Sequence, residues 1–167
     1  MAYRNKTYVA FASEDISKYR LMEAWRENEH IDFDFYDAHD LYVSRDDSKP
    51  ETIKRNLRER LKNAKQIVLL GSKDGKRKGG DGKSFLAHEI EVIREFKLPV
   101  VIANLDGGRK VNRDVIPSPL ADYYSVSVSF QPKIIMHALD KYVAGFDTSD
   151  TVGPHEYPAS VYTDLGL

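Results

Sequence analysis

Three stretches in the middle of the chain indicate the fold class: "QIVLLG" at Gln66–Gly71, "SFLAHEIEVIREFK" at residues 84–97 and "PVVIANL" at residues 99–105. The first and third are nearly continuous runs of Val, Ile and Leu, which is typical of strands that are covered on both faces. The middle stretch repeats its apolar residues at helical spacing. A buried strand, an amphipathic helix and a second buried strand together predict a parallel βαβ unit.

The same alternation of strand and helix continues on both sides of this unit. The remaining predicted elements are strands at residues 7–12, 33–38 and 124–129 and helices at residues 16–28, 51–63 and 132–143. Five strands in this alternation predict a three-layer flavodoxin-like α/β fold, in which helices cover both faces of a parallel sheet. We assign residues 1–145 to this domain. Residues 146–167 are rich in Asp, Ser, Thr, Gly and Pro, so they are either a docked or a disordered C-terminal tail.

Composition excludes several classes of function. The 167 residues include 25 Lys and Arg against 26 Asp and Glu, and this balance lacks the basic excess of non-specific DNA-binding proteins. The chain has no cysteine, so disulfides, thiolate catalysis and cysteine-ligated metals are excluded. No apolar run has the length of a membrane span, and the first residues lack a signal-peptide pattern. We therefore expect a soluble cytoplasmic protein with no metal site.

The segment "GKRKGGDGKS" at residues 75–84 ends in Gly-Lys-Ser, as a phosphate-binding loop does. Such a loop requires a first glycine at position 77, which is Arg77 here, and it follows its strand more closely. We interpret the segment as a flexible, solvated loop with Ser84 capping the next helix. Its basic cluster could still help to hold an anionic ligand: Lys76, Arg77, Lys78 and Lys83.

Glu89 interrupts the apolar face of the helix predicted at residues 84–97. At about 100° per residue, Glu91 and Glu95 fall on the solvent side, whereas Glu89 projects near the middle of the apolar stripe. A buried carboxylate is costly unless it is paired or used, and its pKa tends to rise. Glu89 either bends out to water, pairs with a neighbouring Lys or Arg, or acts on a ligand. The last reading gains support because this helix starts at the carboxyl ends of the strands, where open α/β sheets bind ligands.

Four segments, taken in order, resemble the motifs of one family. They are "VAFASED" at residues 9–15, "FYDAHD" at residues 35–40, "IKRNLRERLKNAKQIVLLGS" at residues 53–72 and "FLAHE" at residues 85–89. In this order and spacing they resemble a Toll/interleukin-1 receptor (TIR) domain, and more closely the bacterial TIR-like proteins of the Thoeris anti-phage defence type. The resemblance covers roughly residues 6–143. The chain departs from the family where Phe85 and Leu86 replace the Trp and Cys of the glutamate motif.

This resemblance implies an enzyme of the NAD glycohydrolase or ADP-ribosyl cyclase type, with Glu89 as its catalytic carboxylate. NAD would be the substrate, not a cofactor, and would be cleaved between nicotinamide and ribose. The product would be a cyclised or conjugated ADP-ribose that activates a separate defence effector. TIR adaptor domains share the fold without catalysis, so a glutamate in register does not by itself establish activity.

The resemblance also implies residues that would contact NAD and a mode of assembly. The expected substrate-binding residues are Phe11, Ser13, Asp37, His39 and Phe85. Phe11 would stack on a flat ring, and Ser13 would bond a ribose hydroxyl or a phosphate. For Phe11, Ser13, Asp37 and His39, the alternative roles are sheet-end packing and turn capping, and for His39 this alternative is slightly preferred. Family members often form oligomers or filaments in which the segment at residues 40–48 helps to complete a neighbour's pocket.

Two alternatives remain open at this point. A non-catalytic TIR-type interaction module would need Glu89 only for stability. A nucleoside deoxyribosyltransferase-like enzyme shares the fold class and uses a glutamate on a related glycosidic bond. A response-regulator receiver is excluded, because it needs an Asp directly after the strand Gln66–Gly71 and a Lys after the strand at residues 124–129.

Overall fold

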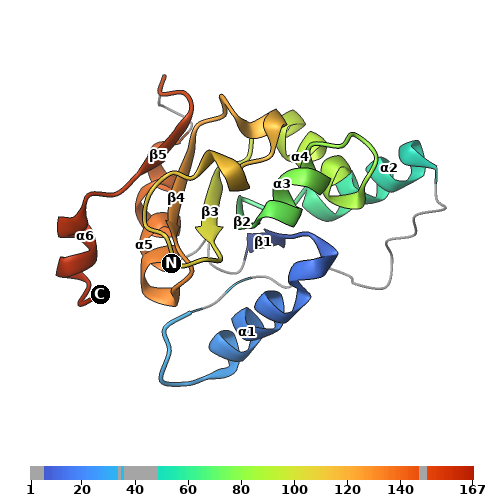
Figure 1. The fold of residues 1–167 in the computed structure, drawn as a ribbon. Helices are drawn as coiled ribbons and strands as arrows, with labels where there is room; N and C mark the ends of the chain where they lie inside the picture. The colour runs from blue at the N-terminus through green and yellow to red at the C-terminus, as the bar shows by residue number, and fades with distance from the viewer. Residues whose placement is uncertain (1–5, 34, 36–48, 147–149) are drawn as a thin grey trace.

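A computed structural model describes residues 6–33, 35, 49–146 and 150–167. Its sheet contains five parallel strands, which lie side by side in chain order (Figure 1). They are β1 (Thr7–Ala10), β2 (Gln66–Gly71), β3 (Val100–Asn104), β4 (Ser125–Ser129) and β5 (Pro154–Glu156). The chain thus has the expected flavodoxin-like α/β fold with a five-stranded parallel sheet.

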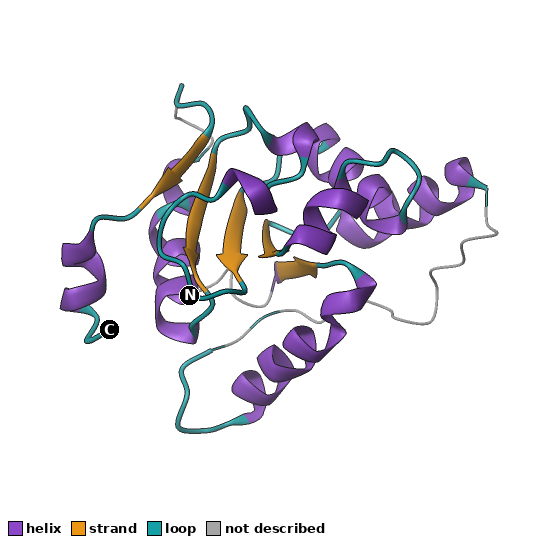
Figure 2. Cartoon of the chain, viewed as in Figure 1, coloured by secondary structure: helices purple, strands orange, loops and turns teal. Residues whose placement is uncertain are grey.

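Helices surround this sheet (Figure 2). They are α1 (Ile16–Glu27), α2 (Pro50–Leu61), α3 (Lys73–Gly79), α4 (Phe85–Glu95), α5 (Pro132–Lys141) and α6 (Ala159–Asp164). Short 3-10 helices lie between some of these elements. Of these, η2 (Ser13–Asp15) leads from β1 into α1, and η3 (Arg113–Val115) follows β3. Within the described ranges, none of these helices combines the length and the apolarity that crossing a bilayer requires.

Two apolar clusters cover the two faces of the sheet. In β2, Ile67 and Leu69 pack with residues of α2 and α4, whereas Val68 and Leu70 pack with residues of α1 and α5. This division follows from the strand period of two, which sends successive side chains to opposite faces. Because both faces are covered, β2 and β3 are buried at every position, which accounts for their continuous apolar sequences.

The fifth strand of the described sheet comes from the C-terminal tail and was absent from the sequence prediction. β5 pairs with β4 from Ser125↔Pro154 onward, and Tyr162 of α6 is completely buried in the cluster on the α1 and α5 face. The hydroxyl of Tyr162 accepts a hydrogen bond from the Ser129 amide at 3.2 Å. Of the strand predicted at residues 33–38, Phe33 and Phe35 are buried outside any strand, and its other residues lie outside the described part of the chain.

The glycine-rich segment contains a helix, so its interpretation as a flexible loop was wrong. The Ser72 hydroxyl caps α3 by accepting a hydrogen bond from the Gly75 amide at 2.9 Å. Gly75 and Gly79 lie one turn apart and are both buried. A Cβ atom at Gly79 would lie only 2.7 Å from the Ile90 side chain of α4. These glycines therefore permit a close approach between α3 and its neighbours, which is the physical reason for their spacing.

Ser84 precedes α4 as predicted, but its side chain does not cap the helix. Its hydroxyl instead donates to the carboxylate of Asp81, which also accepts hydrogen bonds from the backbone amides of Lys83 at 2.9 Å and Ser84 at 2.7 Å. Burial raises the pKa of Asp81, but these hydrogen bonds outweigh it and lower the pKa overall. The amides that a phosphate-binding loop would present to a nucleotide are thus engaged by Asp81, in agreement with the sequence argument against such a loop.

Candidate functional site

Glu89 lies in the second turn of α4 and has no exposed surface. Its Oε2 atom accepts a hydrogen bond from the hydroxyl of Tyr8, a completely buried residue of β1. Arg60 of α2 contributes a positive charge that acts on both side chains. Three residues from three elements thus form a polar cluster within an otherwise apolar layer: the fully buried Tyr8 and Glu89 and the half-buried Arg60.

The protonation state of Glu89 follows from this burial. Loss of water raises the pKa of Glu89 to about 8, although the hydrogen bond from Tyr8 and the charge of Arg60 both act to lower it. Burial is also the main reason that the pKa of Tyr8 is raised. The Glu89 carboxyl is therefore mostly protonated at neutral pH in this conformation, so it is a neutral acid and not a carboxylate.

The other two glutamates of α4 lie on its exposed side, as the helical period predicts. Glu91 forms an ion pair with Lys54 of α2 at 2.9 Å, and Glu95 forms one with Arg58 at 3.0 Å. These pairs connect α2 and α4 on the side of α4 away from the core. Their placement is consistent with the rotation of α4 that turns Glu89 inward.

The structure brings one of the predicted substrate-binding residues close to Glu89 and separates another from it. Phe85 is half-buried one turn before Glu89, on the same side of α4. Phe11 stacks on Tyr19 of α1, with ring centroids 4.8 Å apart, and belongs to the cluster on the opposite face of the sheet. In this conformation Phe11 is thus engaged by a side chain of its own domain. Asp37 and His39 lie outside the described residues.

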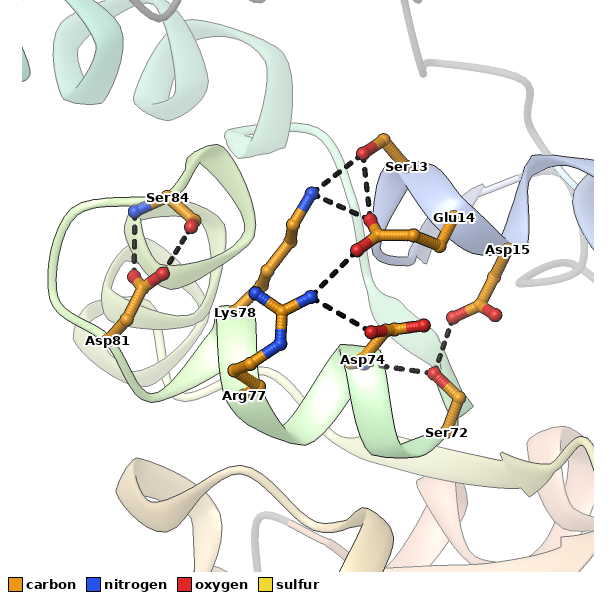
Figure 3. Close-up of polar contacts among 10 residues, drawn as sticks. Ser13, Glu14, Asp15, Ser72, Asp74, Arg77, Lys78, Asp81 and Ser84 are labelled. Atoms are coloured by element: carbon orange, nitrogen blue, oxygen red, sulfur yellow. Dashed lines mark hydrogen bonds and ion pairs between the residues drawn. The ribbon is translucent and has the colours of Figure 1, made fainter.

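Ser13, the remaining predicted contact, belongs to an exposed ionic network between η2 and α3 (Figure 3). Lys78 donates from Nζ to Ser13 Oγ at 2.9 Å and lies 2.6 Å from Glu14 Oε1. Arg77 donates from Nη2 to the other carboxylate oxygen of Glu14 at 2.8 Å and to Asp74 at 2.9 Å. The hydrogen bond from Lys78 is the main reason that the pKa of Glu14 is lowered to about 2.

A second contact ties the same two segments together closer to the sheet. The Ser72 hydroxyl, at the end of β2, donates a hydrogen bond to the carboxylate of Asp15 in η2. Partial burial raises the pKa of Asp15, and the bond from Ser72 offsets part of that rise. The residues that follow β1 and β2 therefore meet at one edge of the sheet, where parallel α/β sheets place their ligand sites.

Sequence reasoning missed Tyr8, Arg60 and Lys78 as neighbours of the predicted site residues. Tyr8 carried a usable signal, since a tyrosine that alternates inward on a buried strand needs a partner for its hydroxyl. Lys78 was singled out only as part of a basic cluster, because its contacts depend on a helix that the glycines concealed. Arg60 carried no signal, because its position near Glu89 depends on how the helices pack. In the described part of the chain, His, Asp and Glu side chains do not gather in groups of three or more that could hold a metal ion.

Comparison with protein families now adds to this geometry. The model of the family described as Thoeris protein ThsB, TIR-like domain, matches residues 8–110. The chain belongs to this family. The matched segment of the TIR-like domain runs from β1 to just beyond β3, so it includes the Tyr8–Glu89 pair, η2 and α3. Among curated proteins, none matches the chain.

Proposed function

We propose that this TIR-like domain cleaves NAD between nicotinamide and ribose, with Glu89 as the carboxylate that acts on the ribose. One observation supports the proposal: Glu89, which the resemblance places at the family's catalytic position, is a fully buried carboxyl group of α4 that is hydrogen-bonded to Tyr8. Ionisation of a buried carboxyl group lowers the stability of the folded protein. Ionisable groups with strongly shifted pKa values are concentrated at functional sites.

The reaction needs little covalent chemistry from the protein. The bond between C1′ and the nicotinamide nitrogen breaks, its electron pair leaves with the neutral nicotinamide, and positive charge develops on the ribose. A carboxylate beside that ribose stabilises the charge more in the transition state than in the ground state. Water or a nucleophilic group of a second molecule then adds to C1′ and releases a proton, or a nucleophilic group of the same nucleotide adds and closes a ring. Phe85, one turn from Glu89, would form an aromatic wall beside the ribose.

In this proposal the described conformation is a resting state. A protonated Glu89 with no exposed surface does not reach a substrate and does not stabilise a cation. Entry of water and NAD would remove the desolvation that raises the pKa, and Glu89 would then ionise at neutral pH. We expect an activating signal or assembly into oligomers to open the site, and the ADP-ribose-derived product to activate a separate effector protein.

A second candidate is a TIR-type interaction module without catalysis. The complete burial of Glu89 also favours this candidate, because a purely structural role, in which the hydrogen-bonded pair holds α4 on β1, is sufficient to explain it. The two candidates differ in the effect of removing the Glu89 carboxyl group. Loss of the carboxylate abolishes chemistry in the first and alters only stability in the second.

The test is incubation of NAD with the parent protein, with Glu89→Gln and with Glu91→Gln, followed by mass spectrometry of the products. Glu91→Gln is the matched control, since it changes the same side chain in the same helix on the exposed face. Circular dichroism verifies that each variant is folded. Each protein is assayed alone, at high concentration, and in lysate from phage-infected cells, which would supply an activating signal.

Release of nicotinamide by the parent and by Glu91→Gln, with its loss in folded Glu89→Gln, is the expected result. The mass of the second product then distinguishes plain, cyclic and conjugated ADP-ribose. Transfer between free nucleobases would instead identify a deoxyribosyltransferase. If no protein releases nicotinamide under any of these conditions, the interaction module replaces the enzyme as the conclusion.

A further inference from the structure

The carboxylate of Glu14 occupies a position surrounded by donors of hydrogen bonds. One oxygen lies 2.6 Å from Lys78 Nζ and accepts from the Ser13 hydroxyl at 3.0 Å, while the other accepts from Arg77 at 2.8 Å (Figure 3). Two oxygens on one atom, held by an ammonium, a guanidinium and a hydroxyl, are the arrangement that a phosphate group also satisfies. Ser13, Arg77 and Lys78 are called the cationic clamp below.

The cationic clamp adjoins a cavity whose lining is also rich in basic side chains. The cavity has a volume of about 510 Å³, and its lining includes Lys73, Lys76, Ser118 and Arg77, which also belongs to the clamp. Lys76 donates to a backbone carbonyl at 3.0 Å, and Lys73 makes no ion pair with the described residues. Anions larger than a carboxylate can thus extend from the clamp into the cavity along α3.

We propose that the cationic clamp binds a diphosphate group and that Glu14 occupies it as an internal anion until the ligand displaces it. Charge supports this assignment. Once Glu14 turns away, three carboxylates remain near the four cations of α3 (Lys73, Lys76, Arg77 and Lys78): Asp15, Asp74 and Asp114. The cations then outnumber the carboxylates, so this region favours an anionic ligand.

Glu14 is suited to leave the clamp. Its side chain is 36% exposed, so it loses little by turning into water. Its pKa of about 2 shows that the carboxylate, and not the acid, is what the clamp stabilises. The hydroxyl of Ser13, which the sequence analysis expected at a ribose or a phosphate, would remain in place as a donor to the ligand. That the diphosphate belongs to NAD rests on the proposed function, whereas the clamp itself does not.

Isothermal titration calorimetry at constant ionic strength tests the clamp. Inorganic pyrophosphate and ADP-ribose are titrated separately into the parent chain and into Glu14→Gln, Lys78→Gln and Lys62→Gln. Removal of the competing carboxylate should tighten binding about two- to fivefold in Glu14→Gln, since exposed ion pairs are weak. Loss of a charged donor should weaken binding about tenfold in Lys78→Gln. Lys62→Gln is the control, because Lys62 belongs to a separate surface ion pair with Glu59. This variant should bind both ligands as the parent does.

Each outcome decides a different part of the proposal. The proposed clamp would be wrong if Lys78→Gln bound pyrophosphate as tightly as the parent does, or if Glu14→Gln bound it no more tightly. It would also be wrong if no protein bound either ligand. If Lys78→Gln is unstable, Ser13→Ala replaces it with a smaller expected loss. Binding of pyrophosphate without ADP-ribose would identify a free diphosphate as the ligand. Because binding requires no turnover, Glu89→Gln should bind pyrophosphate like the parent whether or not NAD cleavage is observed.

Discussion

Glu14 and Glu89 carry the same side chain, and their surroundings shift its pKa in opposite directions. Glu14 is exposed between Lys78 and Arg77, and its pKa is lowered to about 2. Glu89 is completely buried, and desolvation raises its pKa to about 8 even though Tyr8 donates a hydrogen bond to it. Pairing with cations in water favours the charged form, whereas burial favours the neutral one. At neutral pH, one glutamate is thus an anion and the other mostly an acid.

The helix α3 contacts both of the segments that carry these two glutamates. Its Lys78 contacts Glu14, and its Gly79 packs against Ile90, the residue that follows Glu89 in α4. An anion that displaces Glu14 from the cationic clamp would therefore act on a helix that touches the one carrying Glu89.

The largest expected effect is on the pH dependence of stability in Glu89→Gln. The folded-state pKa of Glu89 is raised, so the folded protein binds a proton that the unfolded chain has lost between about pH 4.5 and 8. The stability that this group contributes is full below that window and is lost as the pH rises through it. Relative to Glu89→Gln, the parent should lose up to about 1.4 kcal/mol of unfolding free energy per pH unit across the window. Urea unfolding followed by circular dichroism at several pH values measures this.

Glu91→Gln again serves as the control for this series. It should follow the parent curve, because Glu91 is exposed and lies outside the buried cluster. Parallel curves for the parent and Glu89→Gln would contradict the raised pKa. They would also remove the reason for treating the described conformation as a resting state.

The sequence was sufficient for most of the sheet, and it failed where local patterns were weak. The predicted bounds of β2 are the same as those in the structure, because burial on both faces imposes an uninterrupted apolar run. β5 was missed because its three residues, Pro154–Glu156, are half-buried or exposed and show no apolar pattern. α3 was missed because glycine disfavours helices in general, and only tertiary packing shows why Gly75 and Gly79 are needed.

For the candidate site, the sequence was sufficient to predict the side of α4 on which Glu89 lies, but not the residues that contact Glu89. The helical period alone placed Glu89 on the inner side of α4 and Glu91 on the outer side. The hydrogen bond between Tyr8 and Glu89 joins residues 81 positions apart, so no local pattern signals it. The contact of Glu14 with Lys78 was equally hidden, because it requires α3 to be a helix docked beside η2.

An intermediate effect is expected for Gly79→Ala, which adds a methyl group between α3 and α4. The new Cβ would lie 2.7 Å from the Ile90 side chain and equally close to Pro117, so at least one of them must move. Overpacking of this kind costs about 1–3 kcal/mol of unfolding free energy. Hydrogen exchange should also show faster opening of amides in both α3 and the first turns of α4. Gly145→Ala is the matched control, because a Cβ there meets no atom within 4 Å. Equal unfolding free energies and equal amide exchange in the two variants would contradict the close packing of α3 against α4, the helix that carries Glu89.

The smallest effect is expected for Glu14→Gln. An exposed ion pair contributes at most about 1 kcal/mol, so unfolding at neutral pH should change by no more than that. The direction with pH is opposite to that of Glu89: a lowered folded-state pKa contributes stability above about pH 4.5 that is lost as the pH falls towards 2. The parent should thus exceed Glu14→Gln slightly at neutral pH and converge with it in acid, and added salt should reduce the difference. Nuclear magnetic resonance titration of the Glu14 carboxyl carbon measures the pKa directly. A midpoint near the ordinary value of 4.5 would mean that the clamp does not hold Glu14 in solution, so that no internal anion competes with a diphosphate.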